Sequence, residues 1–130
     1  MAETECGQHG VVSDLGAIER ELRQGDAYRR EGHTARTLVH ASDMRVVLVA
    51  IMAGNRIAEH HANESAALHA ISGRLRVHVE GRVVNVPAGQ LLTLERGLKH
   101  DVEADVDSAF VLTLGWTAPG VGAPAAVRPG

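Results

Sequence analysis

The sequence predicts an all-β sandwich or barrel preceded by one short N-terminal helix. Short apolar segments recur at intervals of about ten residues, with Gly, Pro or Asn signals between them. Hydrophobic residues make up 45% of the chain while aromatic residues make up only 2%, so the core is built from small and β-branched side chains, which favour strands. A chain of 130 residues has the length of a single domain.

The helix is expected to begin at Ser13 or Asp14, because either side chain can cap a first turn. The apolar residues with helical spacing are Leu15, Ile18 and Leu22. Gly25 is expected to end the helix, and residues 26–32 are expected to form a charged connector. Since the apolar stripe is narrow, the helix is predicted to lie against a larger body.

The strands are predicted from residue 34 onward. The segment Arg45–Ala53 has no interior Gly or Pro, which is typical of a strand buried on both faces, and its periodicity alone is also compatible with a short helix. The segment Arg74–Glu80 alternates strictly, with its apolar residues directed inward, and the dipeptide Glu80-Gly81 suits a tight hairpin. The other predicted strands are Thr34–His40, Arg56–Ala62, Ala66–Ser72, Arg82–Val86, Gln90–Leu94, His100–Ala104 and Ala109–Leu114.

This pattern divides the chain into three parts. Residues 1–32 are predicted to form an N-terminal arm with the short helix, and residues 33–116 are predicted to form the β domain. Residues 117–130 are rich in Pro, Gly and Ala and are predicted to be a flexible tail.

Charge and composition exclude several functional classes. A net charge of −3 and the scarcity of aromatic residues argue against nucleic acid as a partner. The longest apolar run, Val46–Ala53, is far shorter than a membrane span, and the acidic N-terminus does not resemble a signal peptide. The single cysteine, Cys6, cannot form an internal disulfide. We therefore expect a cytoplasmic protein with no membrane partner.

The chain has eight histidines, and two of them fall into a recognisable frame of glycines. His60 follows Gly54 after five intervening residues and is followed by Gly73, while His100 follows Gly89 and Gly97. This frame resembles the two motifs of the cupin superfamily, and the resemblance covers roughly residues 34 to 115. It implies a small single-domain cupin-like β-barrel, or jelly roll, that binds a small-molecule ligand or substrate in its barrel. It also implies a homodimer, because cupin-like barrels commonly pair.

The resemblance further implies a possible divalent metal ion, since metal-bearing cupins hold one with two histidines, a glutamate and a later histidine. The residues at those four positions here are His60, Ala62, Ala66 and His100. Alanine cannot bind a metal, and an ion such as Zn²⁺, Fe²⁺, Mn²⁺ or Ni²⁺ needs at least about three N or O ligands. The candidates for a third ligand are His61, His69, His78 and Glu64. A frame shifted by one residue offers Glu59 with His61 instead.

His69 is the first choice as third ligand, which makes His60, His100 and His69 the predicted metal-binding residues. In a regular strand His69 faces the side opposite to Ala66, so this choice depends on its ring entering a barrel interior that alanines leave roomy.

Other charged residues are given structural interpretations. The acidic run Asp101, Glu103, Asp105 and Asp107 alternates with apolar residues and predicts an exposed strand face. His78 is expected on a solvated strand face, and Arg74 and Arg76 are expected to be solvated or at an interface.

Three hypotheses for function follow, and whether the protein is an enzyme is left open. In the first, His60 and His100 line a pocket that binds a small molecule, and if an ion is present there it acts as a Lewis acid or oxygen-activating centre on a small carboxylate or enol-like substrate. In the second, the barrel is a metal-free, non-catalytic binding or sensing module. A purely structural dimerisation domain, with a filled barrel interior, is the third interpretation.

Overall fold

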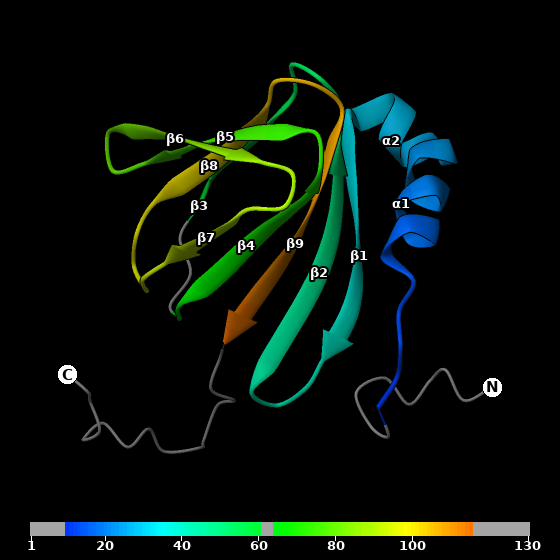
Figure 1. Cartoon of the computed structure of the whole chain (residues 1–130), viewed down its shortest axis with the longest axis horizontal. Helices are drawn as coiled ribbons and strands as arrows, with labels where there is room; N and C mark the ends of the chain where they lie inside the picture. The colour runs from blue at the N-terminus through cyan, green and yellow to red at the C-terminus, as the bar shows by residue number, and fades with distance from the viewer. Residues whose placement is uncertain (1–9, 61–63, 116–130) are drawn as a thin grey trace.

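The computed structural model describes residues 10–60 and 64–115, which form two antiparallel β-sheets with two helices on one side (Figure 1). One sheet has five strands in the order β1-β2-β9-β4-β7, and the other has four in the order β3-β8-β5-β6. The strands are β1 (His33–His40), β2 (Met44–Ile51), β3 (Arg56–His60), β4 (Ala66–Ser72), β5 (Arg74–Val79), β6 (Arg82–Pro87), β7 (Leu91–Leu94), β8 (His100–Ala104) and β9 (Ser108–Gly115). The predicted all-β class and the N-terminal helix are confirmed.

The main hydrophobic core lies between the two sheets and is built from alternate residues of strands β2 to β9. In β5 the buried residues are Leu75, Val77 and Val79, as the strict alternation of this segment predicts. From the five-stranded sheet, Leu68 of β4 and Phe110 of β9 enter the same core. Since the chain has one phenylalanine, aliphatic side chains fill most of this space.

The predicted helix is α1 (Leu15–Gln24), and it begins where the sequence indicates. The Asp14 side chain caps it by accepting a hydrogen bond from the Ala17 backbone N–H at 3.1 Å. The prediction of a connector over residues 26–32 is wrong, because Asp26–Glu31 form a second helix, α2. This short helix is held by the burial of Tyr28 and by Gly32, whose left-handed conformation (φ +84°) closes its last turn.

The helices cover the outer face of β1, β2 and β9, where they bury a second apolar cluster (Figure 1). The members of this cluster that are buried are Leu22, Tyr28, Leu48, Ala50 and Ala109. Glu19 of α1 ties the helical layer to the sheet, because its Oε2 accepts hydrogen bonds from Arg23 at 2.6 Å and from the Ser72 hydroxyl at 2.8 Å. Neither helix in the described part of the chain has the length and apolarity of a membrane span.

The β5–β6 hairpin has the tight turn that the sequence predicts. Glu80 and Gly81 both have positive φ, at +49° and +82°, which is the conformation of a two-residue type I′ turn. The predicted tail, Cys6 and the segment 61–63 lie outside the described residues.

Candidate functional site

His100 opens strand β8 and is directed into the core between the sheets. Only 4% of the residue is exposed, and Val102 and Ala104 follow it on the same inner face of the strand. Its Nδ1 lies 3.2 Å from the carbonyl oxygen of Leu98. Because a carbonyl can only accept a hydrogen bond, Nδ1 must carry a proton. In the neutral ring the lone pair is then on Nε2, the atom that can accept a hydrogen bond or bind a metal.

His100 lines a cavity of about 70 Å³ inside the barrel. The other lining residues are Val49, Ile57, Leu68, Val102, Phe110 and Leu112. Among these described residues, His100 carries the one polar side chain. Since a water molecule occupies about 30 Å³ of liquid, the cavity has room for a group of only a few heavy atoms. The site can therefore hold a small, largely apolar ligand and offer it one hydrogen-bonding or metal-binding nitrogen.

The structure brings the backbones of His60 and His100 together. His60 is the last residue of β3, and it is the cross-strand partner of His100 in β8. The register between these strands is irregular between Ile57 and His60. His61 and Ala62, which the cupin frame also involves, lie outside the described residues. The two most strongly predicted site residues thus lie opposite one another at one end of the four-stranded sheet.

His69 is not brought to this position. It is exposed in β4, between Leu68 and Ala70, which are fully buried in the core. Its cross-strand partners are Leu91 and Val111. Its side chain therefore belongs to the outer face of the five-stranded sheet, as strand parity indicates. Ala66, at the position of the missing glutamate, is buried in the core.

The described residues do not supply a complete metal site. No group of three His, Cys, Asp or Glu side chains within residues 10–60 and 64–115 is placed to hold an ion. The metal assignment to His60, His100 and His69 thus stays a prediction, and we derive no chemistry from an ion.

The acidic run is predicted to be exposed, but its first residue, Asp101, is buried, with only 7% of the residue accessible. Its Oδ2 is 2.7 Å from Arg56 Nη2 of β3, and its Oδ1 is 4.0 Å from His78 Nε2 of β5. The strand register explains this burial, because His78 is the cross-strand partner of Asp101 and Arg56 is the partner of the neighbouring Glu103. The prediction of exposure is therefore wrong for Asp101.

The neighbouring charges form a ladder of ion pairs on the outer face of the four-stranded sheet. Glu103 is 3.3 Å from Arg76 and 3.2 Å from His78 Nε2, and Asp105 is 3.0 Å from both Arg74 and Arg76. His78 is thus partly solvated and paired with a carboxylate. Sequence reasoning missed these pairs because their partners are far apart in the chain.

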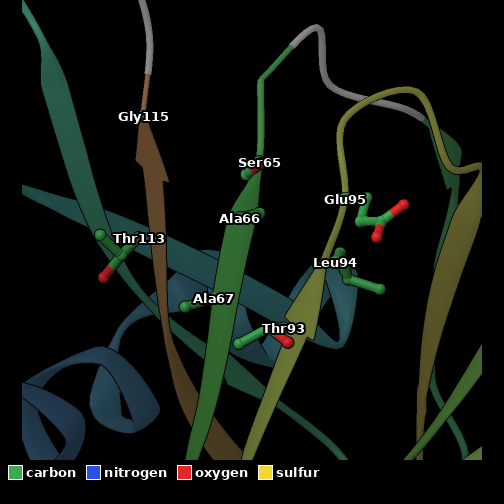
Figure 2. A pocket seen from close by; sticks show the side chains of 8 residues that line it. All are labelled: Ser65, Ala66, Ala67, Thr93, Leu94, Glu95, Thr113 and Gly115. Atoms are coloured by element: carbon green, nitrogen blue, oxygen red, sulfur yellow. The ribbon is translucent and has the colours of Figure 1, made fainter. Parts of the chain in front are cut away.

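A larger hollow, of about 410 Å³, lies at the end of β4, β7 and β9 (Figure 2). It forms where Ala67 is flanked by Thr93 on one side and Thr113 on the other, so that a small side chain stands between two short ones. Of the residues that line it, Glu95 is the charged one. Among the residues that the structure describes, neither His69 nor His100 lines this hollow, and it is far more open than the barrel cavity. We place the candidate site at His100.

Solved structures with a similar fold come from several bacteria. A conserved protein of unknown function from Streptococcus pyogenes, SPY1581, is 19% identical with a TM-score of 0.65, covering 88% of this chain and 92% of that one. KdgF from Halomonas sp. is 19% identical with a TM-score of 0.59, covering 65% and 78%. A salicylate 1,2-dioxygenase from Pseudoaminobacter salicylatoxidans is 15% identical with a TM-score of 0.70, covering 82% and 36%. At such identities these similarities show the fold alone.

The family comparison is more direct. Residues 47–115, more than half of the chain, match the Cupin domain family. No curated protein matches the sequence. The matched range contains β3, β4 and β8, together with both glycine frames and His100. The glycine and histidine spacing, the two-sheet barrel and the family match agree, and the chain belongs to the cupin family.

Proposed function

We propose that the protein binds a small molecule inside its barrel, at His100. The observation that supports this is the pairing of a buried imidazole with an otherwise apolar cavity of about 70 Å³. The contact of Nδ1 with the Leu98 carbonyl orients the ring in this apolar lining. A ligand with a compact apolar body and one polar end, such as a short-chain carboxylic acid, suits a lining of this kind.

The test compares two histidines on opposite faces of the barrel wall. Thermal shift and NMR titration with formate, acetate and propionate are carried out on the wild type, His100→Leu and His69→Leu. We expect binding to be lost in His100→Leu, which removes the cavity nitrogen, and to persist in His69→Leu, because His69 is exposed on the outer face. Binding that is unchanged in His100→Leu, or that is absent for every acid, contradicts the proposal.

A metal-dependent version of this function is favoured by one observation, the cross-strand pairing of His60 with His100. A divalent ion bound by two imidazoles needs about one further ligand or more, which another side chain or solvent must supply. Metal content is measured by mass spectrometry on protein prepared without chelator, for the wild type, His60→Ala and His100→Ala. A bound ion that both variants lose supports this version, and a metal-free wild type contradicts it.

The alternatives from the sequence give different results in these experiments. A metal-free sensing module shows stabilisation by organic acids and none by ions. A structural dimerisation domain shows neither and elutes as a dimer at all concentrations. The homodimer and the cytoplasmic location are part of the proposal, and the oligomeric state is measured by light scattering at several protein concentrations.

A further inference from the structure

A separate polar hollow lies on the outer face of the four-stranded sheet. Its volume is about 260 Å³, and its lining residues are His78, Glu80, Gly81, Lys99 and Asp101. They come from β5, from the β5–β6 turn, from β8 and from Lys99, the residue before β8. Because Asp101 and His100 are consecutive residues of a strand, this hollow and the barrel cavity lie on opposite faces of β8. The lining carries both signs of charge, with two carboxylates, one ammonium group and an imidazole.

Asp101 distinguishes this hollow from an ordinary surface depression. Its side chain is nine-tenths buried, and Oδ2 is held by Arg56 on the β3 side of the strand. Oδ1 is turned to the other side, toward His78 of β5, which also lines the hollow. Among the described atoms, Oδ1 is buried without a hydrogen-bond partner. Arg56 therefore compensates one oxygen of this carboxylate, and within the described residues the charge on the other oxygen is not compensated by a hydrogen bond.

At the rim of the same hollow, Glu80 supplies a second negative charge and Lys99 supplies a positive charge. Glu80 is held at the turn in the left-handed conformation, and its Oε2 accepts a hydrogen bond from the Lys99 backbone N–H at 3.3 Å. This contact keeps a carboxylate beside the residue that carries the only ammonium side chain in the sequence. A bound cation and a bound anion can therefore be neutralised within one small volume.

We propose that this hollow binds a small zwitterion that has a primary ammonium group and a carboxylate, as an amino acid does. The ammonium group donates to the exposed carboxylate of Glu80 and is attracted by the charge of the buried Asp101 carboxylate, which lines the same hollow, and the carboxylate of the ligand pairs with Lys99. A simple carboxylic acid is disfavoured because it meets Asp101 and Glu80, and a simple amine is disfavoured because it meets Lys99. Recognition thus depends on both charges being present in one ligand.

The test uses three probes of matched length: γ-aminobutyrate, butyrate and butylamine. Each is titrated into the full-length, ¹⁵N-labelled protein, and the amide resonances of Gly81 and Lys99 are followed. We expect γ-aminobutyrate to shift both resonances with a Kd at least about tenfold lower than that of either singly charged probe. Equal affinities for the three probes, or no shift at Gly81 and Lys99 up to about 50 mM, overturn the proposal. Zn²⁺ or Mg²⁺ shifting these resonances where the zwitterion does not overturns it as well.

Three variants and two controls assign the binding to the named groups. Asp101→Asn keeps an acceptor for Arg56 and removes the charge, Lys99→Met removes the ammonium, and Glu80→Asn removes the rim carboxylate at a position where asparagine suits the turn. Each is expected to weaken γ-aminobutyrate binding by about fivefold or more. The controls Asp43→Asn and Arg45→Met change exposed charges near the β1–β2 turn and are expected to bind as the wild type does. Unchanged binding in Glu80→Asn and Lys99→Met overturns the proposal even if Asp101→Asn fails to fold.

Discussion

His100 Nδ1 and the Leu98 carbonyl oxygen are 3.2 Å apart, so a histidine at the start of β8 is oriented by the backbone two residues before it. This contact fixes which ring nitrogen carries the proton. We predict that the neutral form of His100 has its proton on Nδ1. Long-range ¹H–¹⁵N NMR correlations, recorded at a pH where the ring is neutral, distinguish the two tautomers. A proton on Nε2 would show that the lone pair points to Leu98 and would remove the basis for a ligand-binding nitrogen in the cavity.

Gly73 joins β4 to β5 in a conformation with φ +77°, and a Cβ there would collide with Ser108 Oγ and the Asp107 carbonyl oxygen. Gly54 has a similar φ, +81°, but open space around it. We predict that Gly54→Ala lowers the free energy of unfolding by about 1 kcal/mol through backbone strain alone. Gly73→Ala is expected to cost about 1–3 kcal/mol more, because the overpacking adds to the strain. Urea denaturation of both variants measures the difference, and equal losses contradict the packing argument.

Glu80 occupies a left-handed position that asparagine and glycine adopt more easily. We predict that Glu80→Asn raises the free energy of unfolding by about 0.5–1 kcal/mol, because the strained position then has a residue suited to it. Thermal or urea denaturation measures this gain. Gln is the matched control, because Glu80→Gln removes the charge without relieving the backbone and should bring no such gain. A loss of stability in Glu80→Asn would mean that the carboxylate contact to the Lys99 backbone outweighs the strain.

Tyr28 anchors α2, and burial raises the pKa of its hydroxyl above the usual value of 10.0. A group whose pKa is higher in the folded protein contributes stability that is fully present below the unfolded pKa and is lost as pH rises through the folded pKa. We therefore predict that stability falls above about pH 10. Because Tyr28 is the only tyrosine, the phenolate absorbance reports its titration alone. In the Tyr28→Phe variant, the loss of folding stability that ionisation of this hydroxyl causes at alkaline pH should disappear. A titration of the wild type that gives Tyr28 an ordinary or lowered pKa contradicts the prediction.

Much of the fold could be predicted because its signals are local. Glycine-containing turns mark the ends of most strands, and the alternation in residues 74–79 gives the buried face of β5 directly. Asp14 caps α1 through a contact within four residues of chain. The cupin frame, which also depends on spacing alone, led to the barrel and to His100.

The remaining features depend on contacts that spacing does not reveal. Helix α2 is too short to show a helical period, and it is stabilised by the burial of Tyr28 against the sheet. The burial of Asp101 depends on Arg56, which is 45 residues away and meets it only through the β3–β8 register. For His69, strand parity gave the correct face, and the expectation of a roomy interior favoured the opposite one. In the described structure Leu68 and Phe110 occupy much of that interior and line the cavity of about 70 Å³ that is left.

Strand β2 separates the two apolar clusters, and its consecutive residues alternate between them: Leu48 and Ala50 pack under the helices, while Val49 and Ile51 enter the barrel. Inserting or deleting one residue in this strand would exchange the two sets, directing each toward the wrong layer. The helices and the barrel cannot therefore change independently at this strand. Length variation among descendants of this sequence should accumulate at the β1–β2 and β5–β6 turns, and β2 should keep its length even where its individual side chains change.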